Sequence, residues 1–203
     1  MGEVARSARG WKYGMKDHSE QGPSHDRRFH GDAGRLRAPA RIALLETPRV
    51  IALCTGGAAI ATVLDVGTGT GVFAEAFLSA GLEVTGIDPV VELLELARAY
   101  VPQALFAAGT AEKLPFPDQS FDLVFLGHVL HETDDPQAAL GEACRTAKKR
   151  IAVLEWPYRR EENGPPLAHR ISPERILALA AVLGFSSLKR TDLSHMDLYV
   201  WDR

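Results

Sequence analysis

The sequence has little cysteine and no long apolar segment. Its 203 residues include two cysteines, Cys54 and Cys144, which fall in expected helices and do not form a metal-spaced pair. No apolar run reaches the roughly 20 residues that cross a bilayer, and the first residues lack the apolar core of a signal peptide. We therefore expect a cytoplasmic protein without a membrane span.

Basic clusters are also scarce outside the N-terminal part. Residues 1–41 carry nine Lys or Arg against five Asp or Glu, whereas the remainder carries 14 against 21. Phosphate backbones need clustered Lys and Arg, so this acidic body argues against nucleic acid as the main ligand. Hydrophobic residues make up 46% and charged residues 24%, which is ordinary for one soluble globular domain of this length.

The strongest positive signal is residues 63–73, a short apolar run that ends in glycines before an amphipathic segment. The run predicts a buried parallel strand, and helical spacing of apolar residues begins at Val72. Gly67, Gly69 and Gly71 allow positive φ angles and a close approach of backbone N–H groups to a ligand. Because the loop also lies at a helix N-terminus, we expect it to bind a ligand with anionic or hydroxyl groups.

Two cofactor classes could use this loop. Residues 69–74 fit the dinucleotide fingerprint G-x-G-x-x-A, but Gly67 already follows the strand, so the better frame is Asp-x-Gly-x-Gly-x-Gly over residues 65–71. Asp88 ends the next expected strand, where its carboxylate can accept hydrogen bonds from both ribose hydroxyls. Both classes need that acid, so an NAD(P)-dependent oxidoreductase is an alternative.

The frame over residues 65–71 resembles the first motif of class I S-adenosylmethionine-dependent methyltransferases. Residues 109–124 resemble the segment between the third and fourth strands of the methyltransferase type 11 group, which includes ubiquinone and menaquinone C-methyltransferases. With the expected strand that ends at Asp88, these segments make three motifs in the order found in this group, so agreement by chance is improbable. The resemblance implies S-adenosyl-L-methionine as cofactor and methyl transfer to a small-molecule acceptor.

The resemblance also implies which residues bind the cofactor. Thr110 departs from the pattern of the group, in which an acid at this position lies near the adenine amino group, and a hydroxyl is a weaker partner. A non-catalytic protein that binds S-adenosylmethionine or S-adenosylhomocysteine is therefore a further alternative. The implied contacts are Asp65, Gly67, Thr68, Gly69, Gly71, Asp88, Pro89, Thr110, Ala111, Glu112 and Gly127.

Two histidines follow the expected strand 121–126 and are the candidate catalytic residues. The resemblance places His128 beside the transferred methyl group or the substrate, and we expect His131 and Glu132 to begin the next helical segment. A histidine with a neighbouring acid can act as a general base, although a histidine that only hydrogen-bonds the backbone is as common. No metal-ligand cluster is present in the pattern, so no metal is expected.

The order of strand and helix patterns predicts an α/β fold, a three-layer Rossmann-like, doubly wound sheet of seven strands. The sheet is expected to be mostly parallel, with a C-terminal antiparallel hairpin over residues 185–191 and 196–201. We expect residues 1–34 to be a mobile or lid-forming leader, with 24–30 as the lid candidate, and residues 35–203 to form the methyltransferase domain. The assembly is expected to be a monomer or homodimer.

Two further expectations concern basic residues. The run Lys148-Lys149-Arg150 follows a helical pattern, so we expect it at the C-terminal end of that helix, where it would complement the helix dipole. Residues 164–170 contain two prolines and are expected to form a loop over the pocket. Leu167, His169 and Arg170 are its possible substrate contacts.

Overall fold

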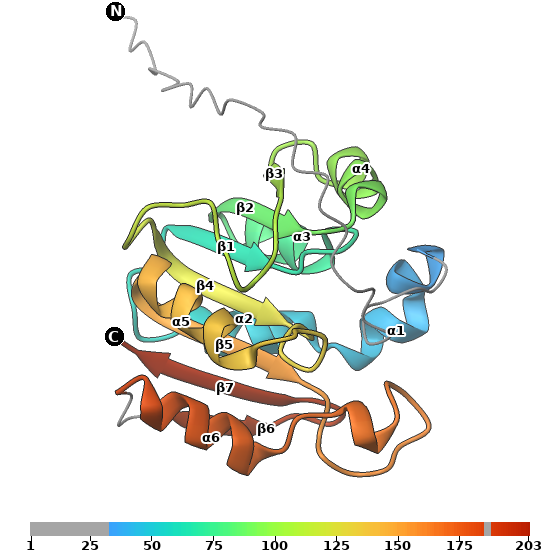
Figure 1. Cartoon of the computed structure of the whole chain (residues 1–203). Helices are drawn as coiled ribbons and strands as arrows, with labels where there is room; N and C mark the ends of the chain where they lie inside the picture. The colour runs from blue at the N-terminus through green and yellow to red at the C-terminus, as the bar shows by residue number, and fades with distance from the viewer. Residues whose placement is uncertain (1–32, 185–187) are drawn as a thin grey trace, which may run out of the picture.

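The computed structural model describes residues 33–184 and 188–203, and within them one seven-stranded sheet has the order β3-β2-β1-β4-β5-β7-β6 (Figure 1). The first five strands in this order run parallel, and β7 pairs antiparallel with both β5 and β6. The predicted sheet and C-terminal hairpin are therefore confirmed. The strands are β1 Thr62–Val66, β2 Glu83–Asp88, β3 Leu105–Ala108, β4 Phe121–Gly127, β5 Ala147–Glu155, β6 Lys189–Asp192 and β7 Asp197–Asp202.

Helices cover both faces of the sheet, because successive strand residues point to opposite sides. On β4, Leu123 and Phe125 join the core under α2 and α3, whereas Val124 and Leu126 join the core under α5 and α6. Figure 1 shows α5 and α6 in front of the sheet and α2 and α3 behind it. The helices are η1 Ala33–Arg37, α1 Pro39–Leu44, α2 Thr47–Thr55, α3 Val72–Ser79, α4 Val91–Tyr100, α5 Pro136–Thr146, η2 Leu167–His169 and α6 Pro173–Val182.

Side-chain caps fix two helix starts. The Asp135 carboxylate accepts hydrogen bonds from the backbone N–H groups of Gln137 and Ala138, and Ser172 caps α6 in the same way through Arg175. Proline follows each cap, where the fixed φ suits the first helical turn. The sequence therefore defines where these two helices begin.

The expected placement of Lys148, Lys149 and Arg150 at a helix end is wrong, because all three lie in β5. α5 ends at Thr146, and the chain then turns directly into the strand. Arg150 is buried there and forms an ion pair with Asp202 at 2.6 Å. Its guanidinium also donates hydrogen bonds to the carbonyls of Cys54 and Gly56. The ion pair and these hydrogen bonds together satisfy the buried guanidinium.

The topology places a binding site beyond the ends of β1 and β4. The chain leaves β1 toward β2 and β3 on one side and continues from β4 to β5 on the other, so these two adjacent strands form a topological switch point. The predicted leader falls almost entirely on residues 1–32, outside the described residues, and its boundary with the domain stays a prediction. The start of the predicted hairpin, residues 185–187, also lies outside them.

Candidate active site

The glycine loop after β1 has the backbone that its sequence predicts. Gly67, Gly69 and Gly71 have φ angles of +66°, +54° and +80°. A Cβ atom at Gly67 would lie 2.4 Å from Val129 Cγ2, so a side chain at this position would force Val129 to move. Gly71 caps α3 and faces Ala97 of α4, so it shapes the loop rather than lining a hollow.

Asp65 is a buried carboxylate beneath this loop. Thr68 Oγ1 donates to Asp65 Oδ2 over 2.6 Å. Burial raises the pKa of Asp65 to about 7, and the nearby Asp88 adds to the rise while the Thr68 hydrogen bond opposes it. A bound cation would favour the ionised carboxylate at this position.

Asp88 ends β2 and holds the loop from the other side. Its two carboxylate oxygens accept hydrogen bonds from the backbone N–H groups of Gly69 and Val90, each at 2.9 Å. The side chain is buried but still lines a hollow of about 120 Å³. The carboxylate is thereby fixed in orientation before any ligand binds.

The predicted cofactor residues surround two neighbouring hollows. The first, of about 120 Å³, is lined by Gly67, Gly69, Asp88, Pro89, Thr110, Ala111 and Glu112. The second, of about 70 Å³, is lined by Asp65, Gly67, Thr68, Gly69 and Gly127. All of the predicted residues except Gly71 therefore lie around one site, and their role in binding stays a prediction.

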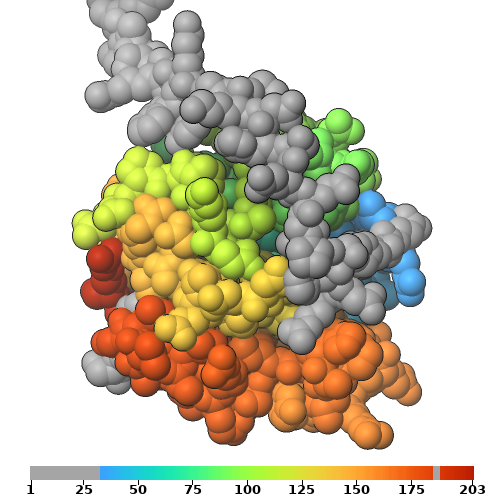
Figure 2. All heavy atoms as spheres, in the orientation of Figure 1, coloured from blue at the N-terminus to red at the C-terminus, as the bar shows by residue number. Residues whose placement is uncertain are grey.

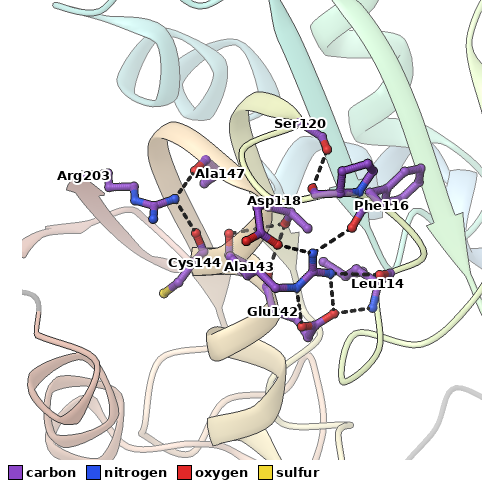
Figure 3. Close-up of polar contacts among 12 residues, drawn as sticks. Leu114, Phe116, Asp118, Ser120, Glu142, Ala143, Cys144, Ala147 and Arg203 are labelled. Carbon is purple, nitrogen blue, oxygen red and sulfur yellow. Dashed lines mark hydrogen bonds and ion pairs between the residues drawn. The ribbon is translucent and has the colours of Figure 1, made fainter.

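The loop after β3, residues 109–120, is anchored by α5. Glu142 Oε2 accepts a hydrogen bond from Leu114 N, and Arg145 donates to the carbonyls of Leu114 and Phe116 and to Asp118 (Figure 3). Hydrogen bonds from Arg145 and Leu114 lower the pKa of Glu142, so it stays ionised. Figure 2 shows this loop, in yellow-green, lying against α5, in amber.

A second contact ties the same loop to the segment that follows β4. Glu112 Oε1 accepts a hydrogen bond from Asp134 N at 3.1 Å, and Lys113 N donates to the Thr110 carbonyl at 3.3 Å. Thr110, Ala111 and Glu112 therefore form a closed turn at the rim of the first hollow. The Glu112 carboxylate has a structural contact in addition to its place in the lining.

His128 lies where the hollows meet. Its φ angle is +62°, its backbone N–H donates to the Leu154 carbonyl, and its ring centroid is 5.0 Å from that of Trp156. Both ring nitrogens are buried and make no hydrogen bond among the described residues. Burial, Arg41 and His131 hold the pKa of His128 well below its usual range, so the ring is neutral.

His131 is not in a helix, which corrects the expectation that it begins one with Glu132; α5 starts only at Pro136. Its ring Nδ1 lies 2.7 Å from Glu155 Oε2, and its backbone N–H donates to Glu155 Oε1 at 3.3 Å. Burial lowers the pKa of His131, but the charge and hydrogen bond of Glu155, together with Glu132, raise it overall.

The N-terminal helices cover the site. In η1, Arg37 donates to the Thr70 carbonyl and forms an ion pair with Glu75 of α3 at 2.8 Å. These contacts hold Leu36 over Gly69, within 3.6 Å of where a side-chain Cβ would stand. Among the described residues, the cover is therefore 33–44, and the predicted lid segment 24–30 lies outside them.

Arg41 of α1 lines both cofactor hollows and a larger cavity. Burial lowers the pKa of the Arg41 guanidinium, and the charge of Glu132 opposes this shift. Within residues 33–184 and 188–203, Arg41 makes no hydrogen bond or ion pair. The larger cavity has a volume of about 560 Å³. Its lining comprises Arg35, Leu36, Ala38, Ala40, Arg41, Leu44, His128, His131, Glu132, Trp156, Asn163, Gly164 and Pro165.

Sequence reasoning missed Arg41 and the pairing of Glu155 with His131. Glu155 ends β5 as Asp88 ends β2, so an acid at the end of a strand was the available signal.

Arg170, an expected substrate contact, is instead buried, and its guanidinium donates to backbone carbonyls. The acceptors belong to Pro157, Arg159, Asn163 and Pro165.

The strand order, the antiparallel β6 and β7 and the glycine loop between two acids define a class I methyltransferase fold. A family model described as "Methyltransferase domain", the type 11 group, matches residues 64–152. Over these residues the chain is similar to this family of S-adenosylmethionine-dependent methyltransferases, which favours S-adenosylmethionine over a nicotinamide dinucleotide as the cofactor.

Relatives support the same assignment. The chain is 37% identical over 109 residues to the uncharacterized methyltransferase Rv3342 of Mycobacterium tuberculosis, covering 53% of this chain and 44% of the relative. It is 37% identical over 98 residues to the demethylmenaquinone methyltransferase of Renibacterium salmoninarum, covering 47% and 41%. The chain thus spans less than half the length of these curated relatives.

A solved structure, a SAM-dependent methyltransferase from Aquifex aeolicus, has the same fold, with a TM-score of 0.74 at 24% identity. The similarity covers 84% of this chain and 95% of that one.

Within residues 33–184 and 188–203, no helix is long and apolar enough to cross a bilayer. The same residues contain no group of three or more His, Cys, Asp or Glu arranged to hold a metal ion.

Proposed function

We propose that this chain transfers the methyl group of S-adenosylmethionine to a small-molecule acceptor. The observation that carries the proposal is the pair of buried carboxylates, Asp65 on β1 and Asp88 on β2, on either side of one glycine loop. The loop lies beside hollows that share Leu36, Arg41 and His128 with a larger cavity. Cofactor and acceptor would thereby meet at these three shared residues.

The residues at the second hollow fit the amino-acid end of the cofactor. Asp65 is a buried carboxylate whose pKa is raised to about 7, and Arg41 is a guanidinium without an acceptor in the described parts of the chain. An ammonium beside Asp65 and a carboxylate beside Arg41 would satisfy both groups at once. Gly127 lines the same hollow, and its carbonyl would also accept from the ammonium.

The first hollow fits the nucleoside. Asp88 is held by two backbone N–H groups at the lining of this hollow, and its carboxylate would accept hydrogen bonds from the sugar hydroxyls. Pro89, Val90 and Leu93 supply apolar cover, and the turn at Thr110 and Ala111 would face the adenine edge. Here the Thr110 hydroxyl would stand in for the acid of related proteins.

S-adenosylmethionine supplies an electrophilic methyl carbon bound to a sulfonium. The task left to this chain is to hold a nucleophile in line with that carbon and to exclude water. A cavity of about 560 Å³ falls within the range of small-molecule sites, about 300 to 1,000 Å³. A small-molecule acceptor, as in the demethylmenaquinone methyltransferases, therefore fits the available space.

Isothermal titration calorimetry with S-adenosylhomocysteine and NADH tests this function. We expect S-adenosylhomocysteine to bind and NADH not to bind. Asp88→Asn should weaken binding at least tenfold, whereas Glu83→Gln, an exposed position on the same strand, should leave it unchanged. Binding of NADH alone would contradict the proposal, and cofactor binding without methyl transfer to any of a broad set of acceptors would favour a non-catalytic binding protein.

A further inference from the structure

We propose that Glu155 is a positioning residue that makes His131 the general base of this site. We also propose that the acceptor is one whose nucleophilic oxygen or nitrogen loses a proton on methylation. Both statements rest on the proposed methyl transfer. They add the identity of the base and the chemical class of the acceptor.

The geometry of the Glu155–His131 pair carries this inference. Both oxygens of a fully buried carboxylate contact His131, with Oε2 at 2.7 Å from Nδ1 and Oε1 at 3.3 Å from the backbone nitrogen. A carboxylate on Nδ1 holds the proton there and leaves the lone pair on Nε2. His131 and Glu132 both line the cavity of about 560 Å³, and His131 Nε2 lies 3.8 Å from Glu132 Oε1.

His128 does not share this arrangement. Neither of its ring nitrogens has a partner among the described residues, and the cation of Arg41 lies near enough to disfavour a protonated ring. A base must hold the proton that it takes. His128 therefore remains a neutral group that can hydrogen-bond the acceptor, and the proton goes to His131.

The proposed step balances in atoms and charge. The acceptor's O–H or N–H bond breaks and its proton moves to His131 Nε2, while the acceptor atom bonds to the methyl carbon. The carbon–sulfur bond breaks and its electron pair stays on sulfur. The positive charge of the sulfonium is thereby exchanged for an imidazolium that lies against the Glu155 carboxylate.

Four charged groups surround or influence the two histidine rings. Glu155 comes from β5, Glu132 lies 3.8 Å from His131 Nε2, Arg170 precedes α6 and opposes protonation of His131, and Arg41 comes from α1 and acts on His128. His131 also disfavours protonation of His128. Glu155 has the closest contact with His131, so removing its charge should change His131 most.

Titration of the histidine rings by NMR tests the inference without an acceptor. The His131 signal is assigned by its loss in His131→Asn, and Glu155→Gln keeps the size of the side chain but removes the charge. We expect Glu155→Gln to lower the pKa of His131 by about one unit or more. Glu162→Gln, an exposed position in the loop after β5, should leave it unchanged.

The result is read only in variants that still bind S-adenosylhomocysteine. If Glu155→Gln binds it but His131 titrates as in the unaltered protein, the positioning role of Glu155 is contradicted while the proposed function stands. If the unaltered protein does not bind S-adenosylhomocysteine, the proposed function fails instead. Should Glu155→Gln fail to fold, Glu155→Asp replaces it, and a shift of the His131 titration is again the expected result.

Transfer of a radiolabelled methyl group tests the acceptor class. Catechol and aniline carry an O–H or N–H proton on the atom that would be methylated, whereas pyridine and nicotinamide present a ring nitrogen without one. We expect methylation of the first pair only, with a loss of at least 100-fold in His131→Asn. Methylation of pyridine or nicotinamide that survives in His131→Asn would contradict the inference, and where no compound is methylated the NMR titration decides.

Discussion

Thr68 Oγ1 donates a hydrogen bond to Asp65 Oδ2 over 2.6 Å, which ties the glycine loop to the strand beneath it. This contact only partly offsets the cost of burying a carboxylate whose pKa is raised to about 7. Asp65 therefore lowers the stability of the folded chain at neutral pH, and we infer that it is kept for the ligand. The contribution of Asp65 to the free energy of unfolding should therefore depend on pH.

Asp65→Asn should stabilise the protein at alkaline pH. The folded-state pKa lies above the unfolded one, so the favourable contribution of protonated Asp65 is complete below the unfolded pKa of 3.8 and lost as pH rises through about 7. The stability of the variant relative to the unaltered protein should rise between pH 5 and pH 8 by about 2 to 3 kcal/mol. Urea unfolding at the two pH values measures this, and an equal difference at both would contradict the account.

Gly67→Ala should destabilise the fold and abolish cofactor binding. The new Cβ would lie 2.4 Å from Val129 Cγ2, at a φ of +66°. We expect a loss of about 2 to 4 kcal/mol in the free energy of unfolding, combining strain and overpacking. Gly81→Ala is the matched control, because Gly81 has a φ of +86° with open space around it, and only the smaller backbone cost should appear there.

Arg145→Ala should weaken binding of S-adenosylhomocysteine by about tenfold, because it releases the loop that carries Thr110 and Ala111 from α5. Arg203→Ala removes contacts of Arg203 with Cys144 and Ala147 at the other side of α5 (Figure 3). It should leave the dissociation constant unchanged. Calorimetry on both variants decides, and equal affinities in the two would show that the Arg145 contacts do not shape the site.

Arg41→Met should weaken binding of S-adenosylhomocysteine but not of 5′-methylthioadenosine, which lacks the amino-acid carboxylate. We expect a loss of about 10- to 100-fold for the first ligand, since a charged hydrogen-bonded pair is removed. Arg35→Met changes an exposed side chain that lines only the larger cavity, so it should affect neither ligand. Equal losses for both ligands in Arg41→Met would place the guanidinium elsewhere.

Local pattern predicted much of the fold. The sequence around Gly67 and Asp88 shows the ends of buried strands directly, because apolar runs that stop at glycine or an acid have few other interpretations. The placement predicted for residues 148–150 was wrong because it, too, was inferred from local pattern alone. Basic residues after a helix fit its dipole, but strand pairing and the Asp202 ion pair are contacts with residues far along the chain.

The unpredicted part of the site depends on such long-range contacts. Glu155 and His131 are 24 residues apart and meet only because β4 and β5 are neighbours in the sheet. Arg41 lies in α1 and reaches the hollows because the preceding η1 is held against α3 by Arg37. The contacts of Arg37 are with Thr70 in the glycine loop and Glu75 in α3, far along the chain. Single-sequence periodicity carries no information about either arrangement.

A crystal structure with S-adenosylhomocysteine tests the central claim most directly. The account predicts sugar hydroxyls within hydrogen-bond distance of the Asp88 carboxylate, the ammonium beside Asp65, and the sulfur facing the cavity that His131 lines. A ligand bound elsewhere, or a sulfur turned away from that cavity, would contradict it.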